Sequence, residues 1–392
     1  PTRRRGEHAW QILGSGRLSS RIRTDGAGGL SWNQHALTRG DAGFWIYLHD
    51  RDADVTWSAT GGPFSRPEDA PEVIFQAHQV EFHQRAHGLS VTTTINVTNA
   101  DDLEIRRVAL VNDSDKPRTI EVTGYAQIVL APAQDAARHP AFSKLFVGAE
   151  ALPGNDGLLF TRRPRSSAER PPVLLTRVIG DEDGVTLLGL EADRSAFIGR
   201  YGCPRRPALL TGELPGGPLG WTLDPICAIR MTVELPPRAR REFAFVTIAA
   251  GSRQSALELA ERFTTLPSLD WAVSDTASAA AREMHKLGLQ PHIVPQAQAL
   301  LSTLLTRAAE PGSAGARTFR RGDLWALGIS GDHPILMLRS GTAEQQDLLR
   351  QLLSFHKLMR QRGMPIDLVV THEGTSGYID PHSPSKSLIS LS

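Results

Sequence analysis

The segment from Arg320 to Pro334 carries side chains whose chemistry suits a sugar or a phosphate group. Two guanidinium groups, those of Arg320 and Arg321, come shortly before the sequence Gly-Ile-Ser-Gly-Asp at residues 328–332. Guanidinium groups and the backbone N–H groups of a tight turn bind phosphate oxygens, and a carboxylate accepts hydrogen bonds from sugar hydroxyls. A tight turn closed by Asp332, with no ligand, is the alternative interpretation. The candidate sugar- or phosphate-facing residues are Arg320, Arg321, Ser330, Gly331 and Asp332.

A second segment, residues 138–146, combines aromatic rings with polar groups between two strand-like runs. Phe142 and Phe146 suit burial against another surface, while the neighbouring imidazole, hydroxyl and ammonium groups suit polar contacts at its rim. The pattern is typical of a loop that docks on another domain. The candidate interdomain residues are His139, Phe142, Ser143 and Lys144.

Asp50, Asp52 and Asp54 have the spacing that opens a calcium-binding loop. Such a loop also needs glycine at its sixth position and glutamate at its twelfth. Val55 and Gly61 occupy those positions here, so a solvated hairpin turn is the better interpretation.

Three histidines, His78, His83 and His87, lie close together in the sequence. Successive side chains of a strand alternate between its faces, so His78 and His83 point in opposite directions and only His83 and His87 can converge. Two ligands are too few for a metal site. The sequence also lacks the zinc-protease, nucleophile-elbow, paired-cysteine and P-loop motifs. We therefore expect no metal site and no cofactor.

The charge of the chain is balanced, with 43 Lys and Arg against 42 Asp and Glu and a formal net charge of +1. This balance argues against a dedicated nucleic-acid-binding protein, which needs a basic excess to displace counterions. Cys203 and Cys227 are the only cysteines, too few for a disulfide framework, which indicates a reducing compartment. No apolar run approaches the ~18 residues of a membrane span, and no signal-peptide pattern opens the chain. We expect a cytoplasmic chain without nucleic-acid or direct membrane contact.

The elements that must position these groups change in character near residue 252. Before it, apolar residues alternate with period two, for example over 91–97, 120–128 and 229–235, and turn residues separate the runs. Such a pattern predicts many short antiparallel strands in two packed sheets. The four tryptophans of the first 57 residues could stack on sugar rings, but filling the core of this sandwich is the better interpretation.

After residue 252 the apolar spacing becomes helical. Ser252 is a suitable cap for a first helix, and Gly363 is a suitable stop for the last. Two short β-like runs, at 335–339 and 366–370, flank that last helix. The predicted helices cover residues 253–264, 271–287, 295–309 and 343–362.

A series of motifs in this order resembles the phosphorylase region of cyclic β-1,2-glucan synthases, in glycoside hydrolase family 94, formerly glycosyltransferase family 36. The resemblance covers nearly all of residues 10–378, and its specificity lies in the ordered series rather than in any one piece. The matching stretches are Gly16–Ser19, Leu37–Arg39, Trp45–Asp50, Trp57–Ala59, Glu104–Val108, Val129–Pro132, His139–Phe146, Thr161–Arg165, Leu223–Ile226, Leu324–Trp325, Gly328–Pro334 and Ile366–Val369.

The resemblance implies a large antiparallel β-supersandwich of the galactose-mutarotase type, then linker helices, then the start of an incomplete (α/α)6 barrel. It also implies inverting phosphorolysis, in which inorganic phosphate attacks the anomeric carbon and an Asp protonates the departing oxygen. On this basis we expect a supersandwich at 1–265, a helical linker at 266–310, first barrel elements at 311–378, and a foreign or disordered tail at 379–392.

The family's catalytic Asp lies in a Trp-Asn-Asp-Gly motif, and this motif is absent from the sequence; Trp32 and Asn33 are followed by Gln34. We therefore expect no catalytic residue in this chain, with the acid beyond its C-terminus in a barrel domain of a longer parent. Apolar faces of the last helix, near 348–358, should then lack a cover.

The resemblance leads to one functional prediction and one alternative. The chain is expected to be part of an inverting phosphorylase or glycosyltransferase that acts on β-1,2-glucan, releasing α-glucose 1-phosphate, and to be inactive alone. The expected partners are a β-linked glucan and the missing barrel domain, and a homodimer is one assembly it allows. The parent could be tethered to the inner membrane by other segments. The alternative is a non-catalytic carbohydrate-binding or scaffold module.

Overall fold

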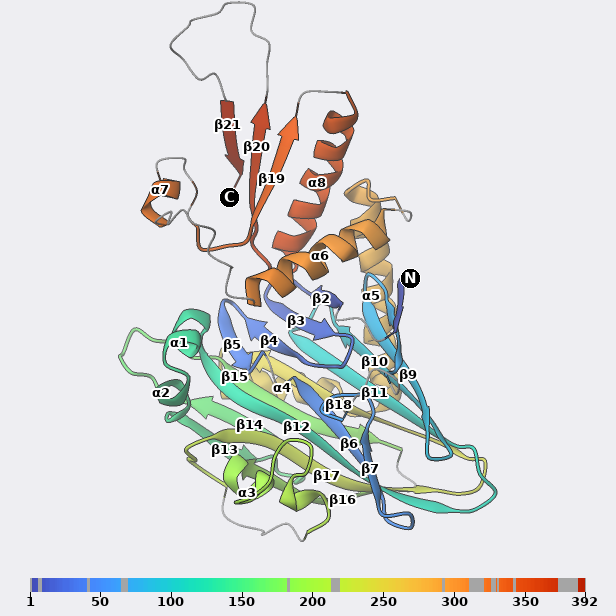
Figure 1. Ribbon diagram of the computed structural model, residues 1–392. Coiled ribbons are helices and arrows are strands. Elements are labelled where there is room, and N and C mark those ends of the chain that lie inside the picture. The colour runs from blue at the N-terminus through green and yellow to red at the C-terminus, as the bar shows by residue number, and fades with distance from the viewer. Residues whose placement is uncertain are drawn as a thin grey trace, which may run out of the picture. The chain divides into compact units, whose positions relative to one another are not determined.

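The computed structural model describes residues 2–5, 9–40, 43–64, 70–181, 184–212, 219–290, 293–309, 321–325, 329, 331–340, 343–372 and 387–391. The chain divides into two compact units, residues 1–280 and 281–392. Within the described residues, no helix combines the length and apolar character needed to cross a membrane. In Figure 1 the strands of the first unit, coloured blue to yellow, form one β body with helices α1, α2 and α3 at its margins.

The first unit contains a nine-stranded sheet in which every neighbouring pair is antiparallel. The alternating run at 91–97 forms one of its interior strands. In spatial order the strands are β1 (Thr2–Arg5), β8 (Glu72–Phe75), β9 (Gln79–Ala86), β10 (Leu89–Val97), β11 (Leu103–Asn112), β18 (Arg240–Ala250), β15 (Val173–Gly180), β14 (Gly157–Arg162) and β13 (Val147–Ala151).

A second sheet is organised around β12 (Arg118–Pro132), which pairs with three other strands, β17, β5 and β6. A fifteen-residue strand can do this because different parts of its length meet different neighbours. In spatial order the sheet runs β16 (Val185–Asp193), β17 (Pro225–Leu235), β12, β5 (His35–Thr38), β4 (Gly28–Trp32), β3 (Leu18–Arg23) and β2 (Trp10–Gly14), with β6 (Phe44–Asp50) and β7 (Val55–Ser58) branching from β12.

The main core lies where the two sheets face each other. One cluster of buried side chains draws members from both sheets, for example Phe82 and Phe243 from the first and Leu48 and Val122 from the second. At Gly124 a Cβ atom would lie 2.5 Å from Phe245 Cε1, so glycine lets that ring pack directly on the backbone. The predicted two-sheet sandwich is therefore confirmed, including its strands at 91–97, 120–128 and 229–235.

Helices cover part of the outer face of each sheet. On the first sheet, α4 (Arg253–Arg262) and the beginning of α5 (Leu266–Lys286) pack Ala256, Phe263 and Leu269 against strand residues such as Ile105 and Val246. The predicted cap is confirmed, because Ser252 Oγ accepts a hydrogen bond from the Ser255 N–H at 3.1 Å. On the second sheet, α3 (Arg194–Ile198) and the short helix η2 (Ala208–Leu210) enclose an aromatic cluster with Tyr47 and Tyr125.

Three of the four early tryptophans, Trp32, Trp45 and Trp57, lie in or against the hydrophobic clusters. Trp45 and Trp57 are buried, and Trp10 and Trp32 are half-buried. The Trp32 indole N–H donates to Asp102 at 2.7 Å, which gives the polar end of the ring a partner. The core interpretation is therefore confirmed for Trp32, Trp45 and Trp57, while the half-buried Trp10 ring lies under the Arg23 guanidinium group.

The second unit contains α6 (Val294–Ala309), α7 (Arg321–Trp325), β19 (Ile335–Ser340), α8 (Ala343–Gln361), β20 (Asp367–His372) and β21 (Ser387–Leu391). Strands β19 and β20 are parallel, and α8 connects them as a crossover helix. The predicted helices and the two predicted β-runs are present at these positions. Figure 1 shows β19, β20 and β21, in orange and red, side by side.

Two expectations for this unit concern the barrel and the tail. Helices α5 and α6 lie within the segment 266–310 of the expected linker, while the start of a barrel at 311–378 remains a prediction. Of the expected foreign or disordered tail at 379–392, the structure describes residues 387–391, which pair as a strand with β20. The free edge of β20 offers a row of backbone donors and acceptors for this pairing.

Candidate functional site

Strand β12 delivers the predicted interdomain segment at one end of the second sheet. Its pairing with β5 shifts register between Ile128 and Ala131, and Leu130 adopts a φ of 50° there. Such a bulge bends a strand and redirects the chain beyond it. Two short helices come next, α1 (Ala133–Arg138) and α2 (Pro140–Lys144), where the sequence analysis expected a loop. Alanines favour the first helix, and Pro140 occupies the favourable first position of the second. We call residues 133–144 the α1–α2 hairpin.

Lys144 holds the hairpin to the sheet. Its Nζ lies 2.5 Å from Asp224 Oδ1, and only 7% of the residue is exposed. Asp224 also lies 3.7 Å from Arg194 Nη1, so one carboxylate faces two cations. The Lys144 side chain therefore forms its ion pair within the chain and does not point into solvent.

The other three predicted interdomain residues divide between interior and surface. Ser143 is buried, and its backbone N–H donates to the His139 carbonyl at 3.0 Å. His139 and Phe142 are exposed, and the Phe142 ring meets Phe146 edge-on with 5.3 Å between ring centroids. The hairpin thus directs an imidazole and an aromatic ring outward from a buried base.

Arginines from the neighbouring motif Thr161–Arg165 flank the hairpin. Arg165 donates to Asp135 of α1 at 2.7 Å, and this hydrogen bond lowers the pKa of the Asp135 carboxyl and raises the pKa of Arg165. Arg162 is buried and donates to the Leu130 carbonyl at 3.1 Å, and burial lowers the pKa of its guanidinium group. These contacts join β14 to the bulge of β12, and the residues that follow β14 to the hairpin.

Large apolar side chains are exposed on the hairpin, at the residue directly after it, and on the segment that supplies Asp224. Phe142 is 51% exposed and Leu145 is 43% exposed, while Trp221 and Leu223, which precede Asp224, are 61% and 80% exposed. The Trp221 ring lies over Gly148 of β13, where a Cβ would be 3.1 Å from the indole. We call these four residues the hairpin patch. A monomer rarely leaves so many large apolar groups uncovered in one region, which makes this a candidate contact surface.

The predicted sugar- or phosphate-facing set lies in the second unit. Arg320 and Ser330 lie outside the described residues, and Arg321 begins α7. Gly331 adopts a φ of 68°, which suits the tight turn expected there, and Asp332 is exposed at that bend. Convergence of the five residues on one ligand remains a prediction.

The acidic and histidine patterns take structural roles. Asp50 Oδ1 accepts hydrogen bonds from the backbone N–H groups of Asp52 and Ala53 and its other oxygen pairs with Arg118, so the hairpin-turn interpretation is confirmed. His83 lies 3.1 Å from Glu81, and the His87 ring packs on Trp57. Within the part of the chain that the structure describes, no three His, Cys, Asp or Glu side chains are grouped to hold a metal ion.

Two features were missed by the sequence analysis. Asp224 drew attention only as part of a motif, and nothing in the sequence pairs it with Lys144, which lies 80 positions away. A polar face formed by β9, β10, β11 and β18 was also missed, although the alternation of Thr92, Thr94 and Asn96 was a signal that one face of β10 is polar.

Comparison with known proteins agrees with the two-sheet architecture. The sequence profile of the family "Glycosyl hydrolase 94, supersandwich domain" matches residues 2–266. The chain is 29% identical over 381 residues to the cyclic beta-(1,2)-glucan synthase NdvB of Rhizobium meliloti (strain 1021), covering 94% of this chain and 13% of the synthase. It is 27% identical over 125 residues to the N,N'-diacetylchitobiose phosphorylase of Vibrio furnissii, covering 31% of this chain and 15% of the phosphorylase.

Solved structures show weaker likeness. A bacterial glucoamylase complexed with acarbose gives 10% identity and a TM-score of 0.38, covering 69% of this chain and 37% of that one. A galactose mutarotase-like protein from Lactobacillus casei gives 11% identity and a TM-score of 0.34, covering 62% and 100%. The chain spans less than a sixth of the length of either curated relative, 13% and 15% respectively. Because the profile covers more than half of the sequence, the chain belongs to the glycosyl hydrolase 94 family, and residues 2–266 are its supersandwich domain.

Proposed function

We propose that this chain is the supersandwich portion of an enzyme that cleaves β-1,2-glucan by phosphorolysis. The observation that carries the proposal is the similarity to a cyclic beta-(1,2)-glucan synthase along 94% of the chain, together with the family match over residues 2–266. The second relative is named as a phosphorylase, which is consistent with phosphate as the attacking group.

The proposed reaction needs one carboxyl acid and one bound phosphate. A phosphate oxygen forms a bond to the anomeric carbon of the terminal glucose, the bond from that carbon to the bridging oxygen breaks, and the acid protonates the departing oxygen. The products are α-glucose 1-phosphate and a glucan shorter by one residue. Phosphate is already anionic, so no second carboxylate is needed to activate a nucleophile.

In this proposal the chain supplies binding surface, and the acid belongs to a barrel domain that this chain contacts. The family's Trp-Asn-Asp-Gly motif does not occur in these 392 residues. The hairpin patch is the surface proposed to meet that domain, because an ion pair between Lys144 and Asp224 joins its two segments while Phe142, Trp221 and Leu223 remain exposed. Arg320, Arg321, Ser330, Gly331 and Asp332 are the proposed sugar- or phosphate-facing residues.

A phosphorolysis assay tests this function. β-1,2-linked glucooligosaccharides are incubated with inorganic phosphate and with either this chain alone or a polypeptide that joins it to the barrel domain. We expect release of glucose 1-phosphate by the longer polypeptide and none by this chain. Turnover by the 392 residues alone would contradict the assignment of the acid elsewhere, and phosphate-independent release of free sugar would indicate a hydrolase.

A non-catalytic carbohydrate-binding or scaffold module is the second candidate. The absence of the acid motif from the sequence favours it. It predicts that the longer polypeptide gives no glucose 1-phosphate while this chain still binds glucan or still stabilises a partner domain.

A further inference from the structure

One face of the first sheet is polar where α5 leaves it uncovered. Alternate residues of adjacent strands share a face, and here they are Thr92, Thr94 and Asn96 on β10, with Arg107 on β11. Residue pairs in register across the strands include Thr94 with Arg107 and Asn96 with Gln79. This face lies opposite the buried one that carries Ile95 and Val108.

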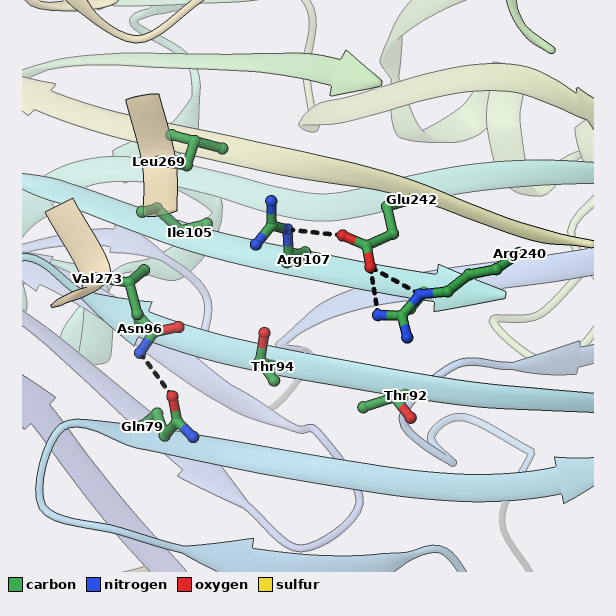
Figure 2. Close-up of a pocket in the computed structure, with 11 residues that line it drawn as sticks. Gln79, Thr92, Thr94, Asn96, Ile105, Arg107, Arg240, Glu242, Leu269 and Val273 are labelled. Atoms are coloured by element: carbon green, nitrogen blue, oxygen red, sulfur yellow. Dashed lines mark hydrogen bonds and ion pairs between the residues drawn. The ribbon is translucent and has the colours of Figure 1, made fainter. Parts of the chain in front are cut away.

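A cavity of about 280 Å³ lies on this polar face, and we call it the sheet groove. Its apolar wall is formed by Leu269 and Val273 of α5 and by Ile105 of β11 (Figure 2). Its volume is near the lower limit of small-molecule clefts, which hold ~300–1,000 Å³, so it suits a ligand of one or two sugar rings. The polar residues that line it are Gln79, Thr92, Thr94, Asn96, Arg107, Arg240 and Glu242.

The charges of the sheet groove are balanced. Figure 2 shows Glu242 between two guanidinium groups, and its carboxylate oxygens lie 3.3 Å from Arg107 Nε and 2.8 Å from Arg240 Nε. Arg107 also pairs with Asp270 of α5. Asp270 is not among the lining residues, but with it counted beside the groove two cations face two carboxylates, so no excess charge attracts an anion and a neutral ligand is favoured.

Hydrogen-bonding capacity in the sheet groove is left unused by the protein. Arg107 Nε is buried and, despite its distance to Glu242, has no hydrogen bond of acceptable geometry. Among the described residues, none forms a hydrogen bond with the Thr94 hydroxyl, which faces the same space. A buried N–H without an acceptor is costly, and a ligand oxygen would remove that cost.

The surroundings of the sheet groove disfavour other polymers. Strands β9, β10, β11 and β18 are interior strands with neighbours on both sides, so a peptide finds no free edge on which to add a strand. Nucleic acid needs an excess of basic groups, which the balanced charges do not provide.

We propose that the sheet groove binds a neutral saccharide, with sugar hydroxyls on Glu242, Arg107 and Thr94 and the C–H face of the ring on Leu269 and Ile105. Charged groups make strong hydrogen bonds to hydroxyls, and a small apolar wall completes a typical sugar-sized site. The identity of the sugar as a β-linked glucan rests on the proposed function; the existence of the site does not. Such a site would hold the polymer on the supersandwich.

Calorimetric titration of the full 392-residue chain with a β-1,2-linked glucotriose tests the site. Lacking an aromatic platform, it should bind weakly, with a Kd on the order of 1 mM. Thr94→Val and Glu242→Gln should each weaken binding by about tenfold or more, since each removes a hydrogen-bonding partner of the sugar. The matched controls are Thr186→Val, an exposed threonine on β16, and Glu150→Gln, an exposed carboxylate paired with Arg253; both should stay within about twofold of the unmodified chain.

Three results would overturn parts of this inference separately. Absence of binding to the glucotriose and to maltotriose, or equal binding by all variants, contradicts the site. If inorganic phosphate binds in the sheet groove more tightly than the sugars do, the proposal of a neutral ligand is contradicted. Suppose that maltotriose binds, that the Thr94 and Glu242 variants lose this binding, and that the β-1,2-linked trisaccharide does not bind. This result upholds a saccharide site and contradicts the proposed substrate.

Discussion

The thiol of Cys227 faces the core between the two sheets, and its protonation state is set by that position. The residue is fully buried on β17, and burial raises the pKa of its thiol to about 12. The other cysteine, Cys203, is exposed. The two sulfur atoms of the chain's cysteines therefore differ in their access to solvent and reagents.

The buried thiol should make the stability of the chain depend on pH above neutrality. In the folded chain Cys227 keeps its proton while the unfolded chain loses it above the ordinary thiol pKa of ~8.5, so unfolding becomes easier as pH rises from there toward about 12. At pH 10 this difference in thiol pKa lowers the free energy of unfolding by roughly 2 kcal/mol relative to pH 7. Urea unfolding between pH 7 and 10 measures it. Cys227→Val should reduce the slope of unfolding free energy against pH, and Cys203→Ser should leave that slope unchanged. An identical slope in the unmodified chain and both variants would contradict the burial of this thiol.

At the scale of elements, a buried ion pair ties the two sheets together. Glu104 and Arg106 project inward from β11, with Arg106 Nε 2.9 Å from Glu104 Oε2. Glu104 accepts a hydrogen bond from Ser20 of β3, and Arg106 donates to the Phe44 carbonyl of β6 at 3.1 Å. Each partner thus reaches across the sandwich to the opposite sheet. We infer that the pair helps to set how the sheets align.

Removing one member of this pair should be costly. In Glu104→Gln the Arg106 charge stays buried without its counter-ion, and the free energy of unfolding is expected to fall by about 3–5 kcal/mol. Glu150→Gln, which weakens the exposed pair with Arg253, should cost less than about 1 kcal/mol. Chemical denaturation of both variants checks the contrast. If both variants lose the same small amount of unfolding free energy, water or another group accepts the hydrogen bonds that Arg106 donates.

The α1–α2 hairpin is also an element-scale feature, because ion pairs link it to segments distant in the sequence. Lys144 and Asp224 are 80 positions apart, and their ion pair has one mostly buried member. The residue types of the hairpin were recognised from the sequence as contact-forming. The inward direction of Lys144 was not, since it depends on where the chain before β17 places Asp224.

At the scale of the whole molecule, the first unit holds the packing that a stable domain needs. The three hydrophobic clusters of the described residues lie between Ala9 and Val273. These bounds nearly coincide with the family's supersandwich domain at 2–266. Independent cores are the usual basis of independent folding.

A chain shortened to residues 1–290 should therefore fold by itself. It keeps α5 whole and retains all three clusters. We expect a cooperative thermal transition of its β-sheet circular dichroism signal within ~4 °C of the corresponding transition of the full chain, the effect of about 1 kcal/mol in a domain of this size. Loss of the transition would mean that residues 291–392 stabilise the supersandwich.

The sequence by itself determined the strands and helices with clear alternation or capping, where several of them begin, and which family the ordered motifs resemble, whereas it predicted a loop where α1 and α2 are found. These features are local, because alternation, capping and turn chemistry act over a few residues, as at Ser252 and along Val91–Val97. Only the tertiary structure decided that Lys144 is held by Asp224, that Glu104 and Arg106 span the sandwich, and that Thr94, Arg107 and Glu242 line one groove. Each of these contacts joins segments remote in sequence, as Asp224 is from Lys144 and Ser20 is from Glu104, and strand pairing, which no local pattern encodes, brings such segments together.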